Sequence, residues 1–130
     1  MATEILVNDG GAPARILPFV AASGGLSAGD CLGINSSGEA FKQDKNNYGL
    51  AGVALTDADA GALVNVISGS GVIVMANCQA DEPTGDVLMV DESNAGKLIT
   101  YADTDADNCE AVALVLESPA AAGLTKVLLL

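Results

Sequence analysis

The sequence predicts a mostly β fold, a single compact, barrel-like domain built from two similar β-units. The first observation is length: 130 residues, half of them apolar, suit one domain that buries roughly two thirds of its unfolded surface. The second is a series of short Val-, Ile- and Leu-rich clusters that alternate with Gly, Asp, Asn and Ser. The third is an internal repeat, which opens with Gly-Asp at Gly29 and again at Gly85.

Residues 1–20 are predicted to form an extended N-terminal arm ahead of a β domain that spans residues 21–130. Apolar stretches at Glu4 to Val7 and Arg15 to Ala21 predict two strands, and the Asp-Gly-Gly-Ala-Pro sequence between them predicts a hinge. Such an arm suits strand addition to a neighbouring subunit, whereas an irregular lead-in with frayed ends is the plainer interpretation. The candidate partner-binding residues of this arm are Ile5, Leu6, Val7, Arg15, Ile16, Leu17, Pro18 and Phe19.

The first β-unit covers about residues 24–77. Its predicted strands are Cys31 to Ile34, Glu39 to Gln43, Leu50 to Leu55, Ala62 to Ile67 and Val72 to Ala76. The polar residues from Asn35 to Gly38 tolerate positive φ and form local side-chain hydrogen bonds, so they predict a hairpin tip. Thr56 and Gly61 bracket an Ala-rich linker, which predicts one helical turn with a hydroxyl cap and a glycine end.

The second β-unit covers about residues 80–130 and repeats this plan. Its predicted strands are Val87 to Val90, Lys97 to Tyr101, Ala111 to Leu116 and Leu124 to Leu129. The segment from Glu92 to Gly96 predicts the matching hairpin tip. Ser118 and Gly123 bracket the matching linker, and Pro119 suits the first position of a second single-turn helix. Neither unit could cover its own apolar face, so we expect the two to pack together.

Charge and composition argue against several classes of partner. With 17 acidic and 5 basic residues the formal charge is −12, which repels nucleic-acid backbones and anionic membrane surfaces. Two Phe, two Tyr and no Trp leave few side chains on which bases could stack. No apolar run long enough to span a bilayer and no signal-peptide pattern is present, so we expect a soluble intracellular product.

The residues that carry common catalytic chemistry are absent or isolated. The sequence has no histidine, which excludes Ser-His-Asp and Cys-His pairs and His-containing zinc sites. No phosphate-binding glycine motif occurs, so no nucleotide cofactor is predicted. Cys31, Cys78 and Cys109 lack CxxC spacing, and we interpret them as buried free thiols. We predict that the protein is not an enzyme.

The acidic segments support an alternative function. Asp103, Asp105 and Asp107 match the first ligand positions of a calcium loop, but Asn108 and Leu114 stand where that loop needs glycine and glutamate. A solvated acidic loop is the plainer interpretation. The alternative hypothesis is a small acidic β-sandwich binding module for a divalent cation or a carbohydrate.

Two further acidic pairs admit simpler interpretations. Asp57 and Asp59 fit the first turn of the predicted helix, where acids favour the helix dipole. Asp81, Glu82 and Asp86 could be imagined to supply the carboxylate pair of a glycosidase, but the sequence offers little aromatic surface to hold a sugar. Neither pair changes the prediction of a protein without an active site.

Four segments in order carry a resemblance to a known family. They are "FVAASGGLSAGDCLGINSSGEAFK", "YGLAGVALTDADAGALVNVISGSGVIVM", "TGDVLMVDESNAGKLITY" and "EAVALVLESPAAAGLTKVLLL". The elements that match are a Gly-Asp before an apolar strand, a "GVA" strand with an Asp/Ala turn, and a second Gly-Asp hairpin before a closing strand. Over about residues 18–130 the sequence resembles the head decoration, or capsid cement, proteins of tailed bacteriophages, particularly those with a β-tulip fold.

This resemblance implies a non-enzymatic virion protein without a cofactor, made in the host cytoplasm and placed on the outer surface of the expanded capsid. It implies the major capsid protein and further copies of this chain as partners, commonly as a homotrimer that bridges and stabilises capsomers. In that family the N-terminal arm, here Ala2 to Phe19, commonly contacts the shell.

Overall fold

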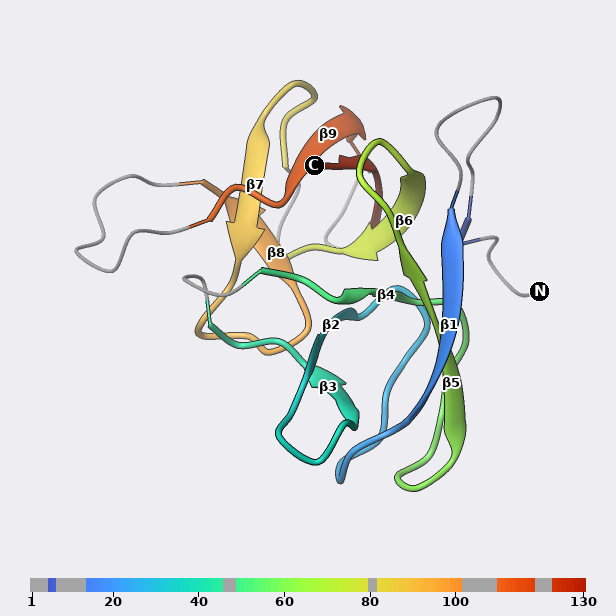
Figure 1. Cartoon of the computed structure of the whole chain (residues 1–130). Coiled ribbons are helices and arrows are strands. Elements are labelled where there is room, and N and C mark those ends of the chain that lie inside the picture. The colour runs from blue at the N-terminus through green and yellow to red at the C-terminus, as the bar shows by residue number, and fades with distance from the viewer. Residues whose placement is uncertain (1–4, 7–13, 46–48, 80–81, 102–109, 119–122) are drawn as a thin grey trace.

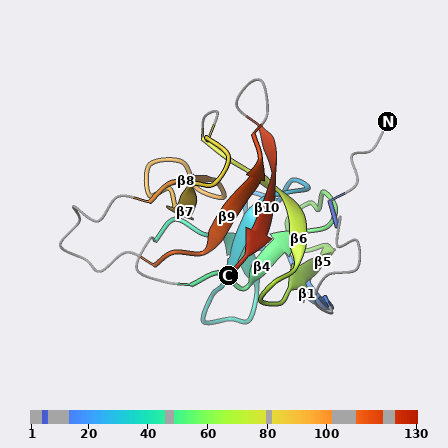
Figure 2. The same cartoon turned by 90° about the horizontal axis from the view of Figure 1, so that it is seen from above.

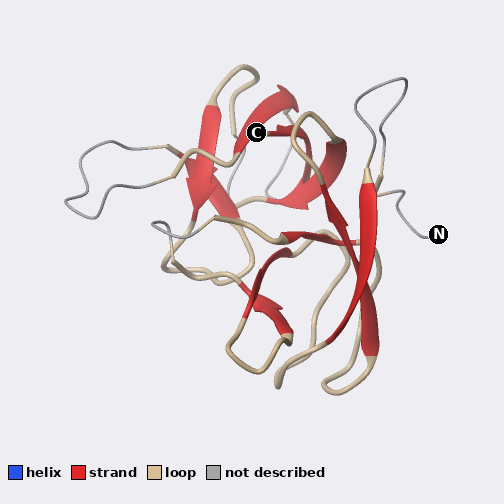
Figure 3. Ribbon diagram, in the orientation of Figure 1, coloured by secondary structure: helices blue, strands red, loops and turns tan. Residues whose placement is uncertain are grey.

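The computed structural model of the chain describes residues 5–6, 14–45, 49–79, 82–101, 110–118 and 123–130. The described residues form strands and turns without a helix (Figures 1 and 3). The ten strands are β1 (Arg15–Val20), β2 (Cys31–Ile34), β3 (Ala40–Lys42), β4 (Gly52–Ala54), β5 (Leu63–Ser68), β6 (Ile73–Asn77), β7 (Val87–Val90), β8 (Leu98–Thr100), β9 (Ala113–Glu117) and β10 (Leu124–Leu129). The prediction of a mostly β fold is therefore confirmed.

The strands form two five-stranded antiparallel sheets. The first has the order β1-β5-β4-β2-β3 and the second the order β6-β10-β9-β7-β8. Adding five to each strand number of the first sheet gives the second, so the two halves of the chain share one topology. In each sheet the first and last strands meet through one isolated parallel bridge, Ala21 with Ala40 in the first sheet and Cys78 with Leu98 in the second. These single bridges do not make a closed barrel, because the edge strands share no ladder. The prediction of a barrel-like body is therefore corrected to two five-stranded sheets, neither of them a closed barrel (Figures 1 and 2).

Equivalent strand pairs have the same register in the two halves, so residues of one half have counterparts in the other. Cys31 faces Val53 across the β2–β4 ladder, and Val87 faces Leu114 across the equivalent β7–β9 ladder. At the edge, Val20 of β1 faces Leu63 of β5. In the second sheet, Asn77 of β6 faces Leu124 of β10. Positions in the two halves can therefore be compared residue by residue.

The two Gly-Asp dipeptides form the same turn before equivalent strands. In the first half the Asp30 N–H donates to the Ser27 carbonyl at 3.0 Å, and in the second half the Asp86 N–H donates to the Pro83 carbonyl at 3.1 Å. The glycine before each aspartate has a φ of 89° and 91°, respectively. A type II turn requires such a φ at its third residue, which glycine adopts without steric cost.

The core follows the alternation of the strands. Leu32, Ala54 and Val66 are fully buried in the first half, and their counterparts Leu88, Val115 and Val127 are equally buried in the second half. A larger cluster connects the two halves, and it includes Ile5 from the N-terminal segment together with Cys31, Val53, Ile67, Val74, Val112 and Leu129. Neither half covers its apolar surface alone, as the repeat predicted.

One predicted helix is wrong. The linker from Thr56 to Gly61 instead contains an isolated bridge, in which Leu26 and Ala58 exchange hydrogen bonds of 2.8 and 2.9 Å. Backbone pairing with a distant segment satisfies the groups that a helical turn would have used. The expected left-handed glycine is present, since Gly61 has a φ of 83°. The second predicted helix, near Pro119, lies outside the described residues.

The N-terminal strand predicted at Glu4 to Val7 is described only at Ile5 and Leu6. Leu6 forms an isolated antiparallel bridge with Val74, and the Ile5 carbonyl accepts a 2.7 Å hydrogen bond from the Met75 N–H. Glu4 and Val7 lie outside the described residues, so the full strand stays a prediction. None of the described segments forms a helix long and apolar enough to cross a membrane.

Candidate binding surface

The predicted arm residues fall into two groups. Ile5 is 2% exposed and belongs to the core, and Leu6 is half-buried beside β6. Arg15 to Phe19 lie in β1, which pairs with β5 along its whole length and forms the outer edge of the first sheet. Val7 lies outside the described residues. The described parts of residues 1–20 thus pack on the body of the protein.

An exposed apolar surface covers the outer face of β1 and β5. Ile16, Val20 and Leu63 are 47%, 39% and 71% exposed, and Pro18 between the first two is exposed as well. Leu17, on the other face of β1, is 43% exposed because no strand lies beyond this edge among the described residues. Exposed apolar side chains that adjoin one another mark an interaction site more often than scattered ones do.

The strand alternation of the sequence carries a signal for part of this surface. In Leu63–Ser68 the exposed Leu63 and Asn65 alternate with the buried Val64 and Val66, so Leu63 faces solvent with an asparagine. A large apolar side chain at a solvent-facing position was the available sign of a binding face. The sequence analysis selected the neighbouring β1 residues and missed Leu63 and Val20.

The equivalent surface of the second half is covered. The counterpart positions are all half-buried, and none is exposed; they are Ile73, Met75, Asn77 and Leu124. Two segments cover them. The Ile5–Leu6 segment lies along β6, and the first Gly-Asp turn lies against Asn77 and Leu124. The uncovered surface on β1 and β5 is therefore a difference between two otherwise similar halves.

Asp30 is a polar link between the halves. Its carboxylate is almost fully buried and accepts hydrogen bonds from the Ser27 N–H at 2.8 Å and from Asn77 Nδ2 at 2.9 Å. Lys42 Nζ lies 3.8 Å from the same carboxylate. A buried carboxylate requires such partners, because desolvation of an unpaired charge is costly. The contacts from both halves assign Asp30 a structural role.

The remaining acidic residues form no metal centre in the described part of the chain. Thr100 Oγ1 donates to buried Glu82 and lies 3.4 Å from an oxygen of Asp86, so these side chains partner one another. No group of three or more potential ligands occurs among the described residues. Asp57 accepts a 2.8 Å bond from the Ala28 N–H and caps a turn, not the helix that was predicted.

The acidic loop of the alternative cation-binding hypothesis is not part of the described structure. Asp103, Asp105 and Asp107 lie outside the described residues, as does Cys109. The other two thiols, Cys31 and Cys78, are free and fully buried, which agrees with the prediction for them. Burial raises the pKa of Cys31 well above its ordinary value and raises that of Cys78 to about 11, so both remain protonated and unreactive near neutral pH.

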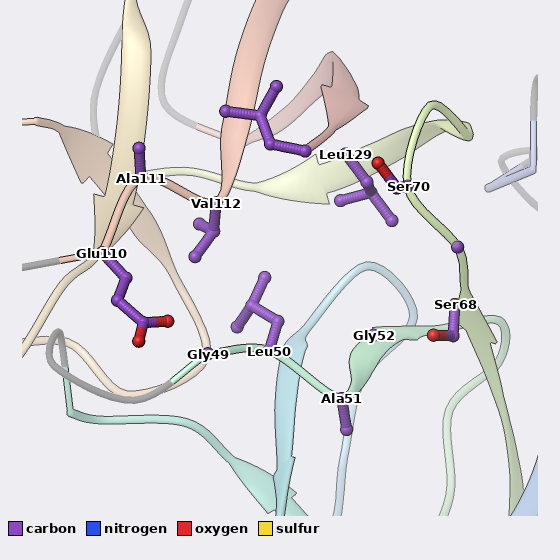
Figure 4. Close-up of a pocket in the computed structure, with 12 residues that line it drawn as sticks. Gly49, Leu50, Ala51, Gly52, Ser68, Ser70, Glu110, Ala111, Val112 and Leu129 are labelled. Carbon is purple, nitrogen blue, oxygen red and sulfur yellow. The ribbon is translucent and has the colours of Figure 1, made fainter.

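A shallow pocket of about 260 Å³ lies where the two halves meet. Leu50, Val112 and Leu129 line it, with Ser68 and Ser70 at one side and Glu110 at the other (Figure 4). Its titratable side chain, Glu110, is exposed and lies across the pocket from the serines. A nucleophile with an adjacent base, as acyl-transfer chemistry needs, is not assembled by these described residues.

One family model and a solved structure match this chain. A family model described as "Phage cement protein" matches residues 12–130. Among solved structures, the head fiber gp8.5 N base of bacteriophage phi29 matches with a TM-score of 0.68 at 17% sequence identity, over 91% of this chain and 95% of that chain. A comparison with curated proteins finds no match.

Proposed function

The chain belongs to the phage cement protein family, whose members are structural proteins of the phage head, and we propose that it binds the outer surface of the expanded capsid and stabilises it by bridging capsomers. The observation that carries the proposal is the exposed apolar edge of β1, next to the Arg15 cation on a protein of net charge −12. The phi29 head fiber base supports the fold on which this edge is displayed.

The predicted arm residues supply the shell contact in this proposal. Ile16 and Leu17 are the exposed apolar side chains, and Arg15 stands directly before them. In the second half the counterparts of Ile16 and Leu17 are Ile73 and Val74, which lie beside the Leu6 bridge. The β1 edge presents a similar surface with no segment of the described chain on it, and an extended segment of the major capsid protein is the occupant we propose.

The cement role needs no catalytic group. A protein on the expanded capsid stabilises the state that it binds, and moderate contacts add when one assembly touches several capsomers. We propose the homotrimer as the form that bridges capsomers, with three β1 edges in one assembly. The acidic surface suits a site outside the shell, away from packaged DNA.

The test replaces the proposed shell contacts by charge. We expect Ile16→Asp and Leu17→Asp to lower the affinity for expanded, undecorated heads by at least about tenfold, because each places a carboxylate in an apolar contact. Ile34→Asp is the control, since Ile34 is 38% exposed but lies at the far end of β2. Co-sedimentation gives the affinities. If all three variants bind as the unchanged protein does, the β1 edge is not the shell contact.

A further inference from the structure

We infer that copies of this protein associate head to tail by repeating, between chains, the contact that joins the two halves within one chain. The inference rests on the internal symmetry of the fold, and it deepens the homotrimer of the proposed function by naming the two surfaces that join its copies. Two surfaces define it. The head surface is the second Gly-Asp turn with Val87 of β7, and the tail surface is Val20 of β1 with Leu63 of β5.

The contact within the chain supplies the template. The first Gly-Asp turn lies on the edge of β6 and β10, where the Asn77 N–H donates to the Gly29 carbonyl at 2.8 Å. Leu124 packs so closely on Gly29 that an added Cβ would lie 2.2 Å from its Cδ2 atom. The turn of the first half therefore docks on an edge pair, Asn77 and Leu124, of the second half.

The head and tail surfaces, which are the counterparts of the residues in this template, are both exposed in a single chain. Gly85, the counterpart of Gly29, is exposed, and an added Cβ there would meet no described atom within 4 Å. Val20 and Leu63, the counterparts of Asn77 and Leu124, are 39% and 71% exposed. If the halves were related by a two-fold axis, these residues would touch one another. They do not, so the contact is heterologous and can continue into another copy.

The apolar face beneath the turn shows the same asymmetry. Cys31, Val53 and Ile67 form a cross-strand row in the first sheet, and each is fully buried against the joint core. Their counterparts in the second sheet include Val87, which is 37% exposed, and two half-buried leucines, Leu114 and Leu128. A second copy docked at the head surface would cover this row as the second half covers the first row.

The two surfaces are positioned for contact between different copies. β7 lies on one side of the molecule and β1 with β5 on the opposite side, in both views of the chain (Figures 1 and 2). Within the chain, Asn77 donates a side-chain hydrogen bond to Asp30. In the contact between copies its counterpart, Val20, would make an apolar contact instead. Thr100, 3.4 Å from Asp86, gives that carboxylate a partner that does not depend on the second copy.

The occupant is therefore a second copy of this chain. The tail surface lies at the end of β1 that holds Val20, whereas the proposed shell contact lies at Ile16 and Leu17 toward its start, so both can be used at once. Each copy carries a charge of −12, and salt that screens repulsion beyond about 8 Å at physiological ionic strength should favour the association.

The experiment measures the mass of the free protein by light scattering after size exclusion, at physiological and at higher salt. We expect the unchanged protein to form a closed ring of three copies, the homotrimer of the proposed function, since a heterologous contact can close into a ring. Leu63→Glu removes the tail surface and Val87→Glu removes the head surface, so each variant alone should be monomeric. Mixed in equal amounts, they should form a heterodimer, because one variant keeps the head surface and the other keeps the tail surface.

Two controls keep the result interpretable. Val20→Glu is a second tail variant and should pair with Val87→Glu in the same way, whereas Ile34→Glu, at a similar exposure to Val20, should leave the mass unchanged. Circular dichroism and thermal melting verify that each variant is folded. A monomeric unchanged protein, or oligomers that survive both Leu63→Glu and Val87→Glu, would overturn the inference. A folded mixture that stays monomeric would overturn it as well.

Discussion

Gly29 and Gly85 have the same backbone conformation in different surroundings. Both follow the same turn geometry, with φ values of 89° and 91°. Gly29 is buried beneath Leu124, while Gly85 faces open space within its own chain. The repeat therefore separates two reasons for a glycine, namely the positive φ that both positions need and the absence of a side chain that only Gly29 needs.

Alanine at the two positions should separate these costs. We expect Gly85→Ala to lower the free energy of unfolding by about 1–3 kcal/mol, because an L-residue is strained at this φ. Gly29→Ala should lose roughly a further 1–3 kcal/mol through the clash with Leu124. Urea denaturation at low protein concentration, where association between copies does not contribute, measures both losses in free energy of unfolding. Equal losses in the two variants would contradict the close packing at Gly29.

The repeated Gly-Asp dipeptide could be found in the sequence, but the burial and contacts of the individual residues could not. The duplicated Gly-Asp dipeptide was visible, and the structure confirms that both copies form one kind of turn. The burial of Asp30 against Asn77 was not predictable, because it depends on how the two halves dock. Likewise, a pattern that repeats cannot show which copy is covered, so Val20 and Leu63 were missed.

At the scale of the elements, strands were predicted well and the linker helix was not. Ten of the predicted strands correspond to β1 through β10, since apolar clusters bounded by turn residues are local signals. The helix prediction for the Thr56 to Gly61 linker was wrong because Leu26 pairs with Ala58. A local capping pattern does not reveal a partner so distant in sequence.

The Ile5–Leu6 segment is a structural element of the second half. Ile5 is buried in the joint core, whereas Ile16 on β1 is 47% exposed. We expect Ile5→Ala to lower the free energy of unfolding by roughly 2–5 kcal/mol and Ile16→Ala to change it by no more than about 0.5 kcal/mol. Thermal or urea unfolding of the pair measures the difference. A small effect of Ile5→Ala would mean that this segment does not support the core.

At the scale of the whole molecule, the fold is one topology used twice with unequal surfaces. The first half keeps an exposed edge at β1 and the second half has that edge covered. The interior needs both halves, because the larger core cluster draws on residues from each. The differences between the halves therefore lie at the surface, where the contacts with partners are proposed.

These surfaces give a body suited to repeated attachment. Ile16 and Leu17 are available to a shell, and Val20, Leu63 and Val87 are available to further copies. Copies joined to one another would each contribute a β1 edge, so several moderate contacts act together. In the proposed function, preferential binding to the expanded capsid would stabilise that state over the others.

The most direct measurement is co-sedimentation of the purified, unchanged protein with expanded heads that lack it, across a salt series, followed by heating of the decorated heads. We expect saturable binding at a fixed ratio to the major capsid protein, and heads that withstand a higher temperature once decorated. Heads that bind no protein, or that bind it without any gain in thermal resistance, would contradict the proposed cement function.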